Sequence, residues 1–197
     1  MNKRNLCGRG LLVSLCGFLS TAVVADPITF NIDPRHTFPS FAADHQSGFS
    51  IWRGKIKETT GTIVLDREAQ IGTVDVSMNM ATIDFGIEAM NDHARAPDIF
   101  DVAQFPTATY TGTLVKFEDG APTAVEGSLT MHGVTQPLNL EIARFRCVES
   151  HPGTMREACG AEITGSLDRS DYGVDFGLGR HLMWVDLAIQ VEAQAAE

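Results

Sequence analysis

Apolar and polar residues alternate along most of the chain from Ile28 onward. Alternation over four to eight residues gives a β-strand one apolar and one polar face. The longest runs have apolar residues at every second position of 74–80 and of 183–191. Clusters of glycine, proline, aspartate and asparagine separate the runs, as turns do. The pattern predicts about eight to ten short strands, and therefore an all-β, antiparallel barrel or sandwich.

Residues 127–137 hold the clearest hairpin signal. Leu129 and Met131 alternate with polar residues before His132-Gly133, and Leu138, Leu140 and Ile142 alternate again after Pro137. Two runs of this kind, joined by a short connection that contains glycine, predict two antiparallel strands and a tight turn.

One segment departs from the β pattern. Ile87, Met90 and Ala94 follow a helical spacing, and 97–103 continues without alternation. We predict one or two short helices here, which would cap the barrel near its mouth. A surface crossover between two strands remains the alternative.

The N-terminus is typical of a secretory signal peptide. Three basic residues precede an apolar run over 11–19, and small residues lead to a cleavage site after Ala25. We therefore expect a cleaved signal peptide at 1–25 and export to the periplasm. Residues 26–197 are then long enough for one domain with its own core.

The chain is acidic, with 15 Lys and Arg against 25 Asp and Glu. The first 25 residues hold three of the basic and none of the acidic residues, so 12 basic and 25 acidic follow, a formal net charge of −13. Such a charge repels nucleic acid, and we expect no nucleic-acid partner. No later apolar run approaches ~18 residues, so we expect no stable membrane insertion. Arg53, Lys55 and Lys57 share one strand face, which we interpret as solvated in preference to a docking patch.

Two cysteines, Cys147 and Cys159, follow the expected signal peptide. In an oxidising compartment, an isolated pair flanking a polar loop predicts a structural disulfide. Metal ligation or a redox-active pair is less well supported, because neither a CxxC motif nor a nearby histidine pair accompanies them.

The sequence contains no G-x-S-x-G elbow, no H-E-x-x-H helix and no glycine-rich phosphate loop before a helix. We therefore expect neither an enzyme nor a cofactor. The alternative is a metal-dependent or stress-related periplasmic enzyme, in which His36 and His45, with Asp33 or Asp44, would supply ligands. We favour histidines with hydrogen-bond partners or at a pocket rim, and expect no metal.

Five segments, in order along the chain, resemble motifs of the YceI-like family of periplasmic, lipocalin-like barrels that bind polyisoprenoid lipids. The match at 127–137 is to G-x-L-T-x-H-G-V-T-x-P. The other four segments are 33–41, 81–86, 92–106 and 168–174. Within 92–106, Ala94 and Ile99 depart from the family pattern, because both are smaller than the usual residues.

The resemblance implies an eight-stranded antiparallel lipocalin-like barrel, and it favours the helical cap over the crossover. It also implies a non-catalytic periplasmic carrier for a polyisoprenoid or other long-chain apolar ligand held in the lumen. A large, partly unfilled apolar interior would suit that role. The candidate wall residues are Phe38, Phe41, Phe49, Trp52, Met78, Met80, Phe100, Phe105 and Trp184.

Polar residues at the mouth would orient the ligand, and we name His36 and Arg95 as candidates. A phosphate head entering so acidic a protein needs a basic site, for which Arg35, Arg53 and Arg95 are available. A neutral, quinone-like head needs none, so we favour it over phosphate. A homodimer could form, although nothing in the sequence requires one. A purely structural barrel filled by its own side chains is the third hypothesis.

Overall fold

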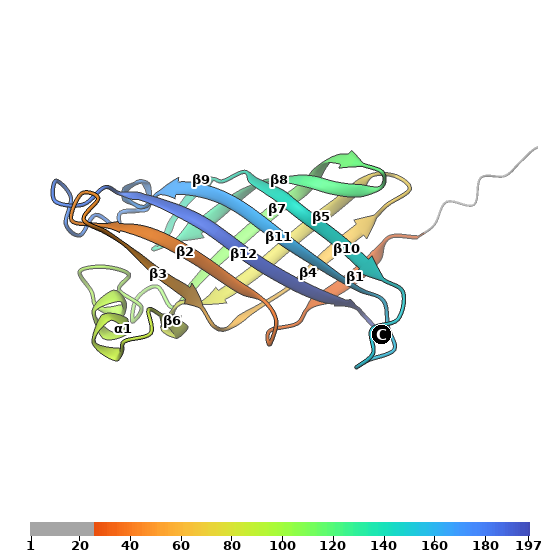
Figure 1. The fold of residues 1–197 in the computed structure, drawn as a ribbon, viewed down its shortest axis with the longest axis horizontal. Helices are drawn as coiled ribbons and strands as arrows, with labels where there is room; N and C mark the ends of the chain where they lie inside the picture. Colours follow the sequence, from red (N-terminus) through yellow and green to blue (C-terminus); the bar gives the residue numbers. More distant parts are fainter. Residues whose placement is uncertain (1–25) are drawn as a thin grey trace, which may run out of the picture.

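The computed structural model describes residues 26–197, so the expected signal peptide lies outside the described part of the chain. Eight antiparallel strands close into a barrel, because β1 is hydrogen-bonded to β4 on one side and to β12 on the other (Figure 1). The barrel strands, in spatial order, are β1 (Ile28–Ile32), β4 (Thr59–Asp66), β5 (Ile71–Asn79), β7 (Thr107–Glu118), β8 (Ala121–Met131), β10 (Leu140–Val148), β11 (Ala158–Asp168) and β12 (Trp184–Ala195). The predicted eight-stranded barrel is confirmed.

Four further strands extend the sheet: β2 (Phe38–His45), β3 (Ser50–Ile56), β6 (Ile83–Asp84) and β9 (Val134–Pro137). β2 pairs with the first half of β12, and β3 and β6 follow it. The described residues thus form 12 strands, more than the eight to ten expected. The excess comes from strands such as β6, whose two residues are too short for alternation to show.

The expected hairpin is present between β8 and β9. His132 and Gly133 connect the two strands with φ angles of 52° and 77°. Positive φ at both central residues is the geometry of a tight hairpin turn, and it explains the glycine.

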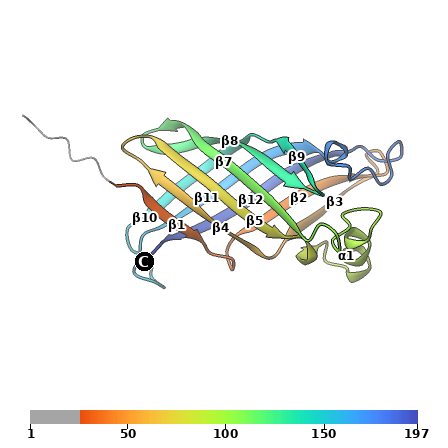
Figure 2. The ribbon, with the colours of Figure 1, turned by 180° about the vertical axis from the view of Figure 1, so that it is seen from behind.

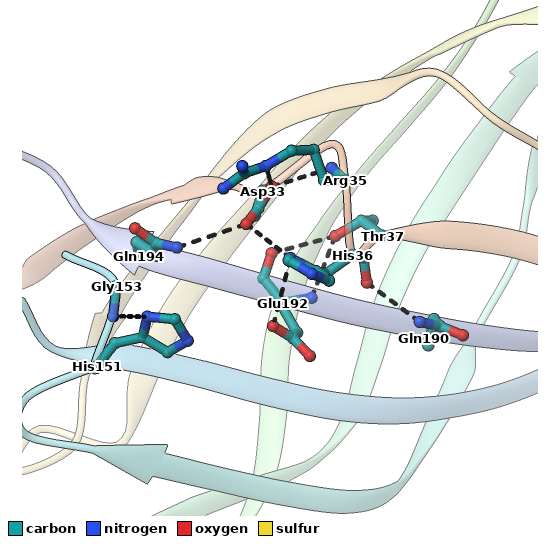
Figure 3. A network of polar contacts seen from close by, with 9 residues as sticks. All are labelled: Asp33, Arg35, His36, Thr37, His151, Gly153, Gln190, Glu192 and Gln194. Carbon is teal, nitrogen blue, oxygen red and sulfur yellow. Dashed lines mark hydrogen bonds and ion pairs between the residues drawn. The ribbon is translucent and has the colours of Figure 1, made fainter.

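A turn separates β1 from β2, and both strands lie on the same edge of β12. Asp33 is buried in this turn, where its carboxylate accepts from the main-chain N–H of Arg35 at 2.9 Å and contacts His36 Nδ1 at 2.9 Å (Figure 3). The hydroxyl of Thr37 forms hydrogen bonds with the main-chain carbonyl and N–H of Glu192. The pKa of Asp33 is lowered, because the hydrogen bond from His36 and those from Arg35 outweigh the effect of burial.

The non-β segment forms one helix, α1 (Glu88–Arg95), and 97–104 continues as turns. The helix packs beside β6, near one end of the barrel (Figure 1). The predicted helical insertion is confirmed as a single short helix.

The two ends of the barrel differ in their connections. At one end β4–β5, β7–β8 and β10–β11 are joined by hairpin loops, whereas the other end carries α1 and the long connection between β11 and β12 (Figures 1 and 2). Two short 3-10 helices, at Met80–Thr82 and Arg169–Tyr172, also lie in the connections. Within 26–197, no helix is both long enough and apolar enough to span a bilayer.

The disulfide between Cys147 and Cys159 is present, with an S–S distance of 2.01 Å. The two cysteines face each other directly in the β10–β11 ladder. The bond therefore joins the strand ends at the end of the barrel that lies opposite α1.

Candidate ligand-binding cavity

A cavity of about 420 Å³ occupies the lumen of the barrel. Inward-facing residues of the barrel strands line it, among them Val74, Val125 and Ile163. The volume falls in the range of small-molecule sites, roughly 300–1,000 Å³, and the wall is almost entirely apolar. Such a wall stabilises a ligand by removing its apolar surface from water.

Rings line the cavity at the α1 end and mark its mouth. The ring centroids of Phe85 and Trp52 are 6.3 Å apart. Those of Trp52 and His45 are 5.0 Å apart, and those of His45 and His181 are 5.3 Å apart. Phe176 lines the same end and is 40% exposed, so the cavity reaches solvent there. The histidines give this rim hydrogen-bonding capacity that the deeper wall does not have.

Helix α1 completes the other side of the mouth. His93 meets the ring of Phe176 edge-on at 4.9 Å, and Met90 and Ala94 also line the cavity. The opposite end is closed by buried side chains such as Phe30, Leu65 and Ala193. The cavity is therefore a blind apolar pocket with a polar rim.

Hydrogen bonds tie the β2–β3 loop to the β11–β12 loop at this mouth. Asp44 accepts from the main-chain N–H of Leu182 at 3.0 Å, and the N–H of Gln46 donates to His181 Nδ1 at 2.8 Å. The pKa of the Asp44 carboxyl is lowered, first by the bond from Leu182 and also by one from Gly48. Because Nδ1 of His181 accepts, its neutral ring carries the proton on Nε2.

Arg169 lines the cavity near its mouth, and its guanidinium forms hydrogen bonds with the main chain. It donates to the carbonyl oxygens of Val174 and Phe176, both at 2.7 Å. Burial lowers the pKa of Arg169. Hydrogen bonds from Ser170 to Asp168 also hold this turn.

Tyr110 contributes a hydroxyl to the cavity wall. Its O–H donates to the carbonyl of Leu138 at 2.9 Å, and burial raises the pKa of Tyr110 to about 12. The group is therefore neutral at physiological pH and already has a hydrogen-bond partner.

Five of the nine candidate wall residues line the cavity: Phe41, Trp52, Met78, Met80 and Phe100. They come from β2, β3, β5, the 3-10 helix after it and the segment after α1. The barrel brings these distant segments around one lumen.

The other four candidates do not line the cavity. Phe38 lies three residues from Phe41 on one strand, hence on the opposite face, and Lys55 Nζ sits 4.9 Å from its ring centroid. Trp184 precedes the inward-facing Val185, so its indole points outward to Asp186. The last two are Phe49, exposed in the β2–β3 turn, and Phe105, whose ring packs on His132 at 4.5 Å.

Neither of the two polar candidates lines the cavity. His36 binds Asp33 in the β1–β2 turn, and Arg95 binds Glu88 at 2.5 Å and Asp92 at 2.6 Å on the surface of α1. These two bonds, first the one to Asp92, raise the pKa of Arg95. Both residues serve local structure, which sequence spacing alone does not reveal.

The alternative metal site is not assembled. His36 precedes β2 and His45 is the last residue of that strand, whose eight residues span about 26 Å, so the two histidines are far apart. Within 26–197, one group of metal-type ligands comes together, Cys147 with Glu157 and Cys159, and its two thiols are bonded to each other.

Several cavity residues were not among the candidates: Phe85, His93, Phe145, Arg169, Phe176 and His181. Phe85 lies in a segment that resembles a family motif, which was a usable signal. Phe176 and His181 lie in a glycine-rich loop without periodicity, so only the fold brings them to the mouth.

A closed antiparallel barrel around a blind apolar pocket defines a ligand-binding barrel. The family model described as "YceI-like domain" matches residues 30–196. Protein YceI of Salmonella arizonae is 31% identical over 191 residues, covering 96% of this chain and 97% of the relative. The chain therefore belongs to the YceI-like family, as the sequence motifs indicated.

Solved structures share the fold at lower identity. YceI of Campylobacter jejuni is 23% identical, with a TM-score of 0.61 over 76% of this chain and 88% of that one. BcnA of Burkholderia cenocepacia is 17% identical, with a TM-score of 0.61 over 79% and 95%. A polyisoprenoid binding domain from Saccharophagus degradans is 14% identical, with a TM-score of 0.58 over 86% and 99%.

Proposed function

We propose that this protein is a non-catalytic periplasmic carrier that holds one polyisoprenoid, or a similar long apolar molecule, in its lumen. The observation that carries the proposal is the blind apolar cavity of about 420 Å³. Each buried CH₂-sized unit of a tail contributes about 0.8 kcal/mol, so the tail would dominate affinity. The fold shared with a polyisoprenoid binding domain supports the same ligand class.

The mouth favours a neutral, quinone-like head. His45, His93 and His181 offer ring nitrogens there, and neutral imidazoles can donate to a carbonyl or hydroxyl. Arg169 is the arginine that reaches the cavity, and two main-chain carbonyls already take hydrogen bonds from it. A phosphate head would therefore meet a net charge of −13 without a free cationic site in the wall. Arg35, Arg53 and Arg95 do not line the cavity.

The periplasmic assignment rests on the N-terminal sequence and gains support from the disulfide. Structural disulfides persist in oxidising compartments and are rare in the cytosol. Protein recovered from the periplasm of its host should begin at Asp26 and have both cysteines oxidised. Recovery of the full-length chain from the cytosol, with free thiols, would refute this assignment.

The proposal is tested by binding a polyprenyl quinone and a polyprenyl phosphate of equal tail length in one buffer. The quinone should bind at least as tightly. Val74→Asp places a carboxylate in the cavity wall and should abolish binding of both ligands, whereas Thr73→Asp, on the outer face of the same strand, should not.

A preference for the phosphate would overturn the neutral head. Equal binding by both β5 variants, each confirmed as folded by circular dichroism, would overturn the lumen as the site.

A further inference from the structure

Exposed apolar side chains gather at the mouth of the cavity. Phe49 is 81% exposed, Leu178 is 65% exposed and Leu182 is 58% exposed, and Ile51, at the start of β3, is also exposed. We call these four residues the mouth patch. The β2–β3 turn and the β11–β12 loop, which hold or border these residues, lie side by side at the α1 end of the barrel (Figures 1 and 2). Contiguous exposed apolar surface marks interaction sites.

The two loops that carry the patch are held together by side-chain hydrogen bonds. Leu182 N–H donates to Asp44, Gln46 N–H donates to His181, and Ser47 Oγ donates to the carbonyl of Arg180 at 3.0 Å. A surface fixed in advance loses less conformational entropy when it binds. The loops that carry the patch therefore have a fixed conformation before any partner binds.

The charge of the patch differs from that of the protein. Segments 46–53 and 176–184 contain Arg53 and Arg180 and no acidic residue, although 26–197 contain 25. The acidic residues that border these segments are Asp44, whose carboxylate accepts hydrogen bonds from Leu182 and Gly48, and Asp175 and Asp186. On neighbouring α1, Glu88 and Asp92 are both paired with Arg95. Exposed apolar side chains with a few basic residues suit the interface of a phospholipid bilayer.

We propose that the mouth patch docks on a phospholipid bilayer, from which the ligand enters the cavity. The proposal rests on the proposed function, because a long apolar ligand resides in a bilayer and not in water. The patch is continuous with the rim through His181 and Phe176, which line the cavity. Burial of the patch at the headgroup–acyl boundary would bring the mouth to the tails, so a ligand need not cross water.

The test is flotation of the protein with vesicles of phosphatidylethanolamine and phosphatidylglycerol. Phe49→Ser with Leu178→Ser should weaken vesicle partitioning at least about tenfold. The matched control is Ile71→Ser with Met155→Ser, which removes two side chains that are 57% and 75% exposed at the other end of the barrel. The control should partition like the wild type. Equal partitioning by both variants would overturn the proposal.

Two further measurements separate docking from ligand binding. Protein loaded from detergent should hold the same amount of a polyprenyl quinone in both variants, while transfer of the quinone from vesicles slows only in the mouth variant. If the wild type takes up no quinone, the proposed function fails, whatever the flotation shows. If the mouth variant instead shifts a dimer to a monomer in sedimentation, the patch joins two copies of this chain, and bilayer docking is overturned.

Discussion

The hydroxyl of Thr37 donates a hydrogen bond to the carbonyl of Glu192 and accepts one from its main-chain N–H, both at 3.1 Å. One side chain thus takes the place of a ladder pair where the chain turns between β1 and β2. The barrel stays closed along β12 although its first strand is interrupted.

Thr37→Val keeps the shape of this side chain and removes both hydrogen bonds. The free energy of unfolding should fall by about 1–3 kcal/mol, because the main-chain N–H of Glu192 loses its partner in a part-buried site, whereas its carbonyl keeps the bond from the N–H of Asp33. Urea denaturation measures the change. Thr29→Val, on the exposed face of β1, should change stability by less than about 0.5 kcal/mol. Equal effects of the two substitutions would show that the Thr37 bonds do not stabilise the barrel.

Both tyrosines of the chain are buried, and burial raises the pKa of each. For Tyr110 the pKa in the folded state is about 12, against about 10 in an unfolded chain. Above pH 10 the unfolded state releases the proton and the folded state retains it, so stability is complete below pH 10 and declines between about pH 10 and 12. Tyr110→Phe should make this decline shallower.

Spectrophotometric titration checks the same point. The folded protein should form no phenolate near pH 10, whereas protein in guanidinium should form both phenolates there. Ordinary titration of a tyrosine in the folded state would contradict the buried placement.

The disulfide closes a loop with a sequence separation of 12. Loop-closure entropy gives a contribution of about 3 kcal/mol. Replacing Cys147 and Cys159 with Ser should therefore lower the melting temperature and leave the circular dichroism spectrum unchanged, because the barrel has its own core. Loss of the β spectrum at room temperature would mean that the barrel requires the bond to fold.

Alternation was sufficient to predict an antiparallel barrel or sandwich, because most strands have one apolar face to bury, and the family resemblance selected the barrel. It was not sufficient to identify the lumen side of each strand. Phe38 and Phe41 are both aromatic and share β2, yet only Phe41 faces the cavity. For the same reason we predicted Trp184 as a wall residue, whereas the structure places its neighbour Val185 in the wall.

The mouth was harder to predict than the wall. It depends on contacts such as that between Asp44 and Leu182, which are 138 residues apart and carry no common motif. The family resemblance pointed to the fold and to the segment of Phe85, but it gave no indication of which loops would meet.

Native mass spectrometry of the protein purified from its own host tests the central claim most directly. The wild type should carry one long-chain apolar molecule that organic solvent releases. Ala161→Phe, which fills the lumen with an apolar side chain, should lower that occupancy, whereas Ala188→Phe, on the exposed face of β12, should not. A wild-type mass equal to that of the bare polypeptide would contradict the claim that the lumen holds a lipid.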